Sequence, residues 1–335
     1  MTLAAKPLLS VCIPSYNRPL ELKRLLDSIY EQNANGLEVV VAEDVSPKRE
    51  EIRNTVETYK VQHPDFNLVL CLNQENLGYD GNLRGLLSLA TGNFCLFMGD
   101  DDVLCQGAIQ KVLEVLQANP EIGMALRDWE EVDLEGNLLS TSKYYPTDKV
   151  FEPGFDTVAE FFRKSIFISG LIFHRETSLK YNTDKFDGIL LYQIYLLSQV
   201  LQERKGFYIA QTLTQRIRGA EHYFGSAGSE KGLFEPKVLK PEHSLNFMQG
   251  FLKILDSIGN HTLKNKVLKD FSNKAFGYLS LQRGNGIKSF IKYSIKLNKM
   301  GFAKTIPFWV YFMMLLILGE KISEKLILNI KNLYQ

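Results

Sequence analysis

Short apolar runs alternate with amphipathic stretches along the first hundred residues of the chain. The apolar runs are predicted to be buried strands, and they cover residues 8–13, 37–42, 67–72 and 94–98, with Pro14 expected to stop the first. The stretches between them repeat apolar residues at helical spacing, and they cover residues 20–32, 50–63, 80–90 and 107–118. Strands that alternate with helices predict βαβ units, a mainly parallel sheet and therefore an α/β fold.

The pattern changes in the rest of the chain. Residues 124–132 and 167–174 are predicted to be further strands, and residues 190–202 a helix. Beyond about residue 235, helical patterns rich in Lys and Leu follow one another without a strand signal. We therefore expect an α/β domain over 1–235 and a helical C-terminal region over 236–335.

The composition is that of a water-soluble globular protein. The chain has 335 residues, of which 45% are apolar and 23% charged, and its formal net charge of +1 gives no field that would favour nucleic acid. The four cysteines have no CxxC spacing, which favours reduced thiols over a zinc site. They are Cys12, Cys71, Cys95 and Cys105. The N-terminal residues lack the pattern of a signal peptide, so we expect a cytoplasmic protein.

Every distinctive polar segment of the α/β half follows a predicted strand. These segments cover residues 14–18, 43–46, 73–80 and 99–102. In open α/β sheets, ligands bind outside the carboxyl ends of the strands. We therefore expect a ligand site formed by these four segments.

The last of these segments contains three consecutive acids, Asp100, Asp101 and Asp102. Adjacent carboxylates repel one another, and a bound cation relieves that repulsion. Mg²⁺ and Mn²⁺ take oxygen ligands and often bridge one or two carboxylates to substrate phosphates. The alternative is a solvated acidic turn in which Asp102 caps the following helix. The position at a strand end favours the metal site.

Three segments of the chain, in this order, resemble the motifs of family 2 glycosyltransferases with the GT-A fold. They read SVCIPSYNRPLELKRLLDSI, LEVVVAEDVS and NLGYDGNLRGLLSLATGNFCLFMGDDDVL, and the last ends in a DxD-type metal motif. The resemblance covers residues 8–120 well and extends more loosely to about residue 225. Within the family, the chain is most similar to the abequosyltransferase-like branch, which builds bacterial O-antigen units.

The resemblance implies contacts between particular residues and a nucleotide-sugar donor. The loop from Pro14 to Arg18 would line the nucleotide pocket, Asp44 would accept a hydrogen bond from the base, and Asp102 with Asp100 would bind the metal. The full set of implied donor contacts is Pro14, Ser15, Tyr16, Arg18, Glu43, Asp44, Gly78, Asn82, Arg84, Asp100, Asp101 and Arg218. Tyr16 as a packing residue, Arg84 as a solvated side chain and Gly78 as a turn glycine are the structural alternatives.

The chain departs from the family pattern where the catalytic base is expected. Inverting members carry an acidic pair on a later helix, and the corresponding stretch, FDGILLYQIYLLSQV, has none. Asp187 is the nearest carboxylate and is our candidate base, while Gln193 cannot accept the proton. Asp187 could instead cap the helix. A later loop, LTQRIRGAEHYFGSAG, supplies Arg216, Arg218 and His222, and the resemblance places His222 near the metal.

The segment 302–318 of the C-terminal region is apolar and aromatic, and lysines flank it on both sides. Its apolar run is shorter than the ~20 residues that span a bilayer. It fits an interfacial helix on an anionic membrane surface. The alternatives are a helix packed on the catalytic domain and an interface in a homo-oligomer.

We expect a glycosyltransferase that uses Mg²⁺ or Mn²⁺ and inverts the anomeric centre. Its acceptor would be a saccharide on a polyprenyl lipid, for O-antigen or capsule synthesis at the inner face of the cytoplasmic membrane. One alternative is a nucleotidyltransferase, although PSYNRP replaces the Gly-rich loop expected after its first strand. The other is a degenerate glycosyltransferase that serves as a scaffold or sugar-binding module, which the missing acidic pair favours.

Overall fold

The computed structural model describes residues 6–238 and 240–333, which divide into two compact units at Lys237 and Val238. The first unit is built on one mixed sheet of the order β3-β2-β1-β4-β9-β6-β10-β5, with β7 paired to β6 and β8 to β10. Its strands are β1 (Leu9–Ser15), β2 (Leu37–Glu43), β3 (Leu68–Leu72), β4 (Phe94–Phe97), β5 (Val103–Leu104), β6 (Ile122–Val132), β7 (Leu138–Ser142), β8 (Lys149–Phe151), β9 (Leu171–His174) and β10 (Lys205–Ile217).

Two halves of the sheet differ in strand direction. Strands β3, β2, β1 and β4 are all parallel, which confirms the predicted βαβ units. Strand β9 then runs antiparallel to both β4 and β6, and β10 is parallel to β6. Pro14 lies inside β1 and does not stop it, contrary to the prediction. Its missing N–H is tolerated because β1 pairs with β4 only from Leu9 to Cys12, so only β2 lies beside Pro14.

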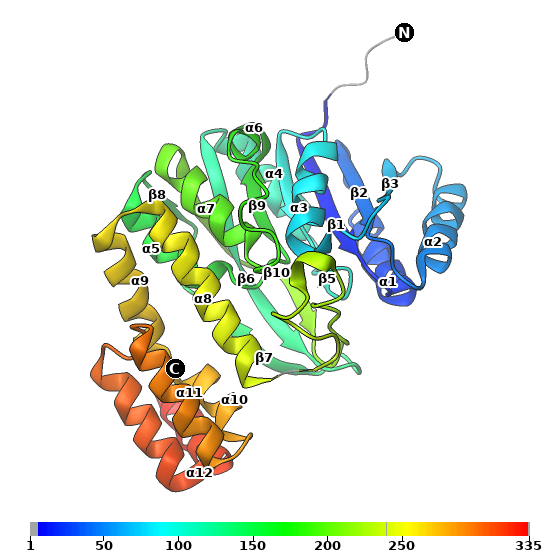
Figure 1. The fold of residues 1–335 in the computed structure, drawn as a ribbon. Helices are drawn as coiled ribbons and strands as arrows, with labels where there is room; N and C mark the ends of the chain where they lie inside the picture. The colour runs from blue at the N-terminus through cyan, green and yellow to red at the C-terminus, as the bar shows by residue number, and fades with distance from the viewer. Residues whose placement is uncertain (1–5, 239, 334–335) are drawn as a thin grey trace. The chain divides into compact units, whose positions relative to one another are not determined.

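Helices cover both faces of this sheet (Figure 1). They are α1 (Pro19–Tyr30), α2 (Arg49–Gln62), α3 (Gly78–Leu89), α4 (Ala108–Ala118), α5 (Phe155–Phe162), α6 (Arg175–Lys180) and α7 (Tyr192–Glu203). Leu9, Val11 and Ile13 alternate along β1 and point to the face where α1, α2 and α4 bury their apolar residues. Helices α3 and α7 pack on the opposite face. The cysteines are all free.

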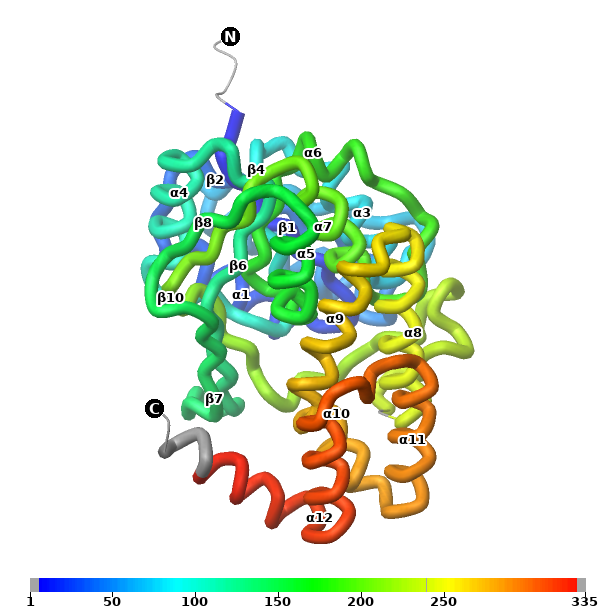
Figure 2. Tube along the Cα trace, turned by 90° about the vertical axis from the view of Figure 1, so that its left-hand side faces the viewer, coloured from blue at the N-terminus to red at the C-terminus, as the bar shows by residue number. Residues whose placement is uncertain are grey.

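The second unit is helical. It consists of α8 (Pro241–Ile258), α9 (His261–Asn273), α10 (Phe276–Arg283), α11 (Ile287–Lys299) and α12 (Ile306–Leu333). The aromatic rings of Phe251, Phe271 and Phe302 pack against one another in its core, at centroid distances of 4.9 and 5.5 Å. Helix α12 is broken at Gly319, where φ is 73°, and its two halves run in different directions (Figure 2).

Candidate active site

The carboxyl ends of β1 to β4 lie at one edge of the sheet, because these strands are parallel and adjacent. The four polar segments predicted to form a ligand site therefore meet there. Direct bonds join them: the backbone N–H of Tyr16, after β1, donates to Asp100, after β4, at 3.0 Å. The side chain of Asn73, after β3, donates to Asp44, after β2, at 2.8 Å.

Arg18 neutralises the first two acids of the cluster. One of its guanidinium nitrogens lies 2.8 Å from Asp100, and the other lies 3.1 Å from Asp101. The second nitrogen also donates to the backbone carbonyl of Glu221 in the later loop. The Arg18 guanidinium packs over the ring of Tyr223 at 5.3 Å, and that ring lies 5.6 Å from the ring of Tyr16. Arg18 therefore ties the later loop to the acidic cluster.

Asp102 is in a different environment from Asp100. Its carboxylate is 4% exposed, and it accepts a hydrogen bond from the hydroxyl of Ser169, which itself accepts from Gly99 N–H at 2.9 Å. Burial and the neighbouring Asp101 raise the pKa of Asp102 to about 8. Burial raises the pKa of Asp100 less, to about 6, because Arg18 opposes it. The helix-cap alternative for Asp102 is wrong, since α4 begins at Ala108 with Gly107 at its N-cap.

The acidic cluster fits a hard divalent cation that also binds substrate oxygens. Among residues 6–238 and 240–333, no three His, Cys, Asp or Glu side chains are grouped so that they could hold a metal ion. A cation would therefore need ligands from a bound substrate, as Mg²⁺ does when it joins one or two carboxylates to phosphates. The buried Asp102 carboxylate, whose charge is disfavoured beside Asp101, would gain most from such a cation. The ring of His222, which the resemblance places near the metal, stacks on the ring of Phe224 with their centroids 6.0 Å apart.

Asp44 and Glu43 both organise loops. Asp44 is 3% exposed and accepts the backbone N–H groups of Leu77 at 2.9 Å and Gly78 at 2.8 Å. Burial nevertheless raises its pKa. Glu43 accepts the N–H groups of Val45 and Ser46, which holds Val45 at a φ of 56°. A left-handed backbone is costly for a β-branched residue, so this turn is strained beside the site.

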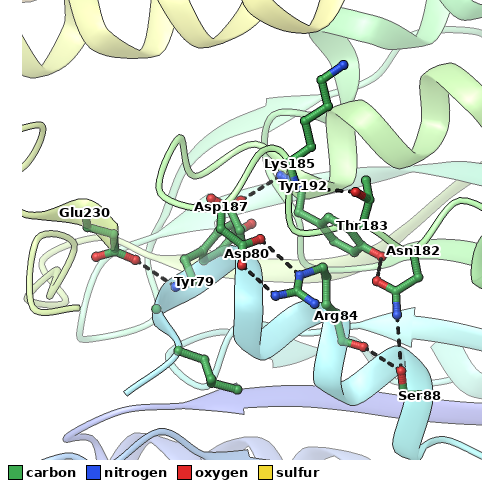
Figure 3. A network of polar contacts seen from close by, with 12 residues as sticks. Tyr79, Asp80, Arg84, Ser88, Asn182, Thr183, Lys185, Asp187, Tyr192 and Glu230 are labelled. Carbon is green, nitrogen blue, oxygen red and sulfur yellow. Dashed lines mark hydrogen bonds and ion pairs between the residues drawn. The ribbon is translucent and has the colours of Figure 1, made fainter. Parts of the chain in front are cut away.

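The N-terminus of α3 joins the site to the later loop (Figure 3). Buried Glu230 accepts the N–H groups of Tyr79 at 2.7 Å and Gly225 at 2.6 Å. Gly78 has no room for a side chain, because a Cβ atom there would lie 2.7 Å from the Glu230 carboxylate. Asn82 donates from its side chain to the carbonyl of Ala42 at 3.0 Å and so fixes α3 on β2. Gly78 and Asn82 thus shape the loop around the predicted donor site.

Asp80 and Asp187 hold the segment before α7. Both oxygens of Asp80 accept backbone N–H groups, from Leu190 at 2.7 Å and Tyr192 at 2.8 Å, and burial raises its pKa to about 7. Asp187 does not cap α7, whose N-cap is Leu191. It forms a two-bond ion pair with Arg84, at 3.0 and 2.6 Å (Figure 3). Arg84 is therefore not the solvated side chain of the alternative view.

Arg216, expected in the later loop, lies on β10, and Arg218 follows that strand; both pair with Glu131. Arg216 lies 3.5 Å from one Glu131 oxygen, and Arg218 donates to the other. Both guanidinium groups are more than half exposed. The residues that sequence reasoning missed are Asp80, Ser169, Tyr223 and Glu230. Each acts through a partner more than 60 positions away, so no local pattern indicates its role.

Several proteins with similar sequences are named as glycosyltransferases. Residues 10–169 match the model of the glycosyl transferase family 2. Abequosyltransferase of Salmonella typhimurium is 28% identical over 38% of this chain and 38% of its own length. GalNAc(5)-diNAcBac-PP-undecaprenol beta-1,3-glucosyltransferase of Campylobacter jejuni is 33% identical over 32% of this chain and 34% of its own. The chain thus spans little more than a third of the curated relatives it matches.

The fold is similar to that of solved glycosyltransferase structures. The structure of TarS residues 1–349 of S. aureus, in complex with UDP-GlcNAc, superposes with a TM-score of 0.60 at 17% identity, over 95% of this chain and 90% of that one. At that identity the likeness concerns the fold, which is the GT-A glycosyltransferase fold. The sequence match over residues 10–169 and the motifs at the sheet edge agree with it, so this part of the chain is similar to glycosyl transferase family 2.

Proposed function

We propose that this protein transfers a sugar from a nucleotide-diphosphate donor to a saccharide acceptor with the help of Mg²⁺ or Mn²⁺. The observation that carries the proposal is the buried Asp102 carboxylate, held by Ser169 at the sheet edge where the four polar segments meet. The related S. aureus structure with UDP-GlcNAc supports a nucleotide-sugar donor.

Different residues of this chain would contact different parts of the donor. Asp102, with Asp100, would hold the cation, which supplies charge stabilisation for the departing diphosphate. Tyr16 and Tyr223 form an aromatic wall beside the cluster. Asp44 directly follows β2, where it would accept a hydrogen bond from the nucleobase. Arg18 gives a positive charge at the same place, where its guanidinium would donate hydrogen bonds to the diphosphate.

Inverting transfer needs a base that accepts the proton of the acceptor hydroxyl. Asp187 remains our candidate, while Gln193 on α7 donates its side-chain N–H to the carbonyl of Ile166 at 3.2 Å. Because both oxygens of Asp187 bind Arg84, one of those bonds must open before Asp187 can accept a proton. His222 and Arg218 from the later loop, and Arg216 from the end of β10, would approach the diphosphate.

We further propose that the acceptor is carried on a polyprenyl lipid and that the protein reaches it from the inner face of the cytoplasmic membrane. The related Campylobacter jejuni transferase bears an undecaprenol-linked acceptor in its name. Within the helical unit, α12 exposes a stripe of large apolar side chains at helical spacing. They are Ile306, Trp309, Val310, Met313 and Ile317, and Ile306 is 80% exposed.

The shape of α12 favours lying on a membrane over crossing it. Among the residues that the structure describes, Ile306–Asn329 is the one stretch of helix long and apolar enough to span a bilayer. The break at Gly319 leaves a first half over 306–318, which is ~20 Å long. A bilayer core is ~30 Å thick. The break is stabilised within the unit, because Arg283 donates to the carbonyl of Leu315 at 3.0 Å and Ser323 to that of Gly319 at 2.6 Å.

Lysines on the same unit would add attraction to anionic lipids. Those of α11 are all exposed and lie opposite its buried face; they are Lys288, Lys292, Lys296 and Lys299. Each lysine near an anionic surface contributes about 1 kcal/mol, and salt weakens that part. Full-length protein should therefore bind vesicles of phosphatidylcholine and phosphatidylglycerol (3:1) at low salt.

A pair of variants tests the membrane contact. Val310→Asp with Ile317→Asp should abolish sedimentation with these vesicles, while Val61→Asp, at an even more exposed apolar residue on α2, should not. The stripe is instead an oligomer interface if the wild-type protein does not bind the vesicles, light scattering shows it to be a dimer, and the double variant is a monomer. The membrane proposal then fails.

Turnover against a panel of nucleotide sugars tests the activity itself. A degenerate scaffold would bind a nucleotide without consuming it, and the absence of an acidic pair around Gln193 is the feature that favours it. Release of nucleoside diphosphate from at least one donor, dependent on Mn²⁺ or Mg²⁺, supports the transferase. Tight binding without release across the panel would support the scaffold.

A further inference from the structure

Three half-buried aromatic residues form a continuous surface near Asp102; we call Trp129, Tyr144 and Phe167 the aromatic platform. The ring centroids of Trp129 and Phe167 are 4.6 Å apart. The indole N–H of Trp129 donates to the hydroxyl of Tyr144 at 3.3 Å. The platform therefore joins the end of β6, the loop before β8 and the segment before β9.

Two covalent and hydrogen-bonded paths connect the platform to the acidic cluster. Phe167 is two residues before Ser169, whose hydroxyl donates to Asp102. Thr214 of β10 pairs with Trp129 on one side and with Leu104, two residues after Asp102, on the other. The platform and Asp102 thus lie at the same edge of the sheet.

The strand order places the platform on one side of Asp102 and the nucleotide segments on the other. Strands β3, β2 and β1, which carry the segments assigned to the donor, precede β4 in the sheet. Strands β9 and β6 follow β4 in the sheet; Trp129 lies on β6, and Phe167 lies in the segment before β9. In the proposed inverting transfer, the acceptor hydroxyl attacks the sugar from the face opposite to the departing diphosphate. The platform lies on the opposite side of Asp102 from the nucleotide segments, which suits an acceptor site.

A fully buried arginine fixes this segment in place. Arg127 donates to the backbone carbonyls of Phe167, at 3.1 Å, and of Ser169. Its guanidinium also packs over the ring of Phe167 at 5.0 Å. Gly170, with a φ of 88°, allows the backbone to lie close to Arg127, because a Cβ atom there would be only 2.7 Å from Arg127 Nε. A buried charge is costly, so its use here indicates that the position of this segment matters.

The platform is not simply part of the core. Neighbouring aromatic residues Phe161, Phe162 and Tyr208 are completely buried, whereas the platform residues each keep exposed surface. Tyr208 fixes the position of Tyr144. Its hydroxyl accepts the backbone N–H of Tyr144 at 3.0 Å and donates to Asp128.

We propose that the aromatic platform binds the acceptor sugar, with the apolar C–H face of a pyranose ring against Trp129. This rests on the proposed function and adds the residues and the chemical class of the acceptor end. A sugar ring suits the surface because aromatic faces bury apolar area while the Tyr144 hydroxyl at the edge can bond a sugar hydroxyl. A flat apolar acceptor without hydroxyls, or an anionic peptide, fits it less well.

Tryptophan fluorescence measures this binding without turnover. The chain has two tryptophans, so Trp309→Phe leaves Trp129 as the single reporter. Titration with methyl glycosides of glucose, galactose and N-acetylglucosamine, in the presence of UDP, CDP or GDP with Mn²⁺, should give a saturable change for at least one sugar. No change with any of the three sugars would overturn the proposal, whether or not the protein is an active transferase.

Kinetics give the second readout. With a nucleotide sugar that the wild type consumes, Trp129→Ala should raise the acceptor KM by roughly tenfold or more, and the donor KM by much less. Phe155→Ala, which removes an exposed aromatic side chain at the start of α5, is the control and should change neither. Equal changes in both constants, or an unchanged acceptor KM in folded Trp129→Ala, would contradict the proposal. Failure of the wild type to consume any donor would instead contradict the proposed function.

Discussion

Replacing Asp44 with Asn should separate two roles of this carboxylate: holding the loop before α3 and binding the nucleobase. One oxygen of Asp44 accepts from Asn73 at 2.8 Å and Leu77 at 2.9 Å, and the other accepts only from Gly78 at 2.8 Å. Asparagine can replace the first oxygen, but its amide group would then face the N–H of Gly78. The substitution therefore removes one charge-assisted bond and leaves a buried donor unsatisfied.

The cost follows from those contacts. A hydrogen bond to a charged group contributes about 1.5–3 kcal/mol, and a buried unsatisfied donor costs about 1–3 kcal/mol. These overlap, so the free energy of unfolding should fall by about 3 kcal/mol. For a unit of this size that lowers the melting temperature by roughly 6–12 °C. If Asp44 also accepts from the base, nucleoside diphosphate binding should weaken by roughly ten- to a hundredfold.

Thermal unfolding and calorimetry with UDP, CDP and GDP measure the two effects separately. Asp133→Asn is the matched control: Asp133 also accepts backbone N–H groups, but in an exposed turn, and its replacement should barely move the melting temperature. A lower melting temperature together with an unchanged affinity for nucleoside diphosphates at 15 °C would support the role of Asp44 in holding the loop. It would contradict its role in binding the nucleobase. A melting temperature equal to that of the wild type would refute the reasoning about buried bonds.

Three further predictions follow from the contacts of α3 and α12. Because burial raises the pKa of Asp80 to about 7, the folded state binds a proton that the unfolded chain has lost above about pH 4. The free energy of unfolding of the metal-free protein should therefore fall as pH rises from about 4 to about 7, and chemical denaturation of Asp80→Asn should show a smaller fall over the same range. A double-mutant cycle of Arg84→Met and Asp187→Asn should give a coupling energy of about 1 kcal/mol in unfolding, and a value near zero would mean that the pair does not hold this segment. Gly319→Ala should destabilise the helical unit in thermal unfolding by about 1 kcal/mol or more, because its φ of 73° is strained for any other residue; an unchanged melting temperature would show that α12 can straighten.

The first four strands could be predicted from the sequence because their apolar periodicity is local. Residues 37–42 and 94–98 are apolar on both faces, as a sheet covered by helices on both sides requires, and they form β2 and β4. The segment 167–174 was predicted less well, since its strand begins only at Leu171. Arg127, about 40 residues earlier, draws the carbonyls of Phe167 and Ser169 out of the sheet.

The candidate site shows the same difference between features that a local pattern indicates and features that depend on distant residues. Asp100 and Asp102 could be found because a strand end followed by three acids is visible in the sequence. The ion pair of Asp187 with Arg84 could not, because the two residues are 103 positions apart and each reads locally as a surface charge. Glu230 also lies in a loop without a motif, and only folding brings it to the N-terminus of α3.

The break in α12 is a third example. Gly319 stands in an otherwise helical pattern, where a glycine is tolerated at a cost of about 1 kcal/mol. The sequence alone therefore predicts an apolar stretch but not its division. The division depends on Arg283 and Ser323, whose side chains bond the carbonyls that the break releases.

The most direct test of the account measures nucleoside diphosphate release from a panel of nucleotide sugars, with Mn²⁺ or with EDTA, in wild type and Asp102→Asn. Asp102 lies in a loop, so the variant should stay folded by circular dichroism. The account predicts release from at least one donor in the wild type, and its reduction by orders of magnitude in the variant and with EDTA. Near-normal release by Asp102→Asn, or release that EDTA leaves unchanged, would contradict the metal role of Asp102 on which the proposed transfer depends.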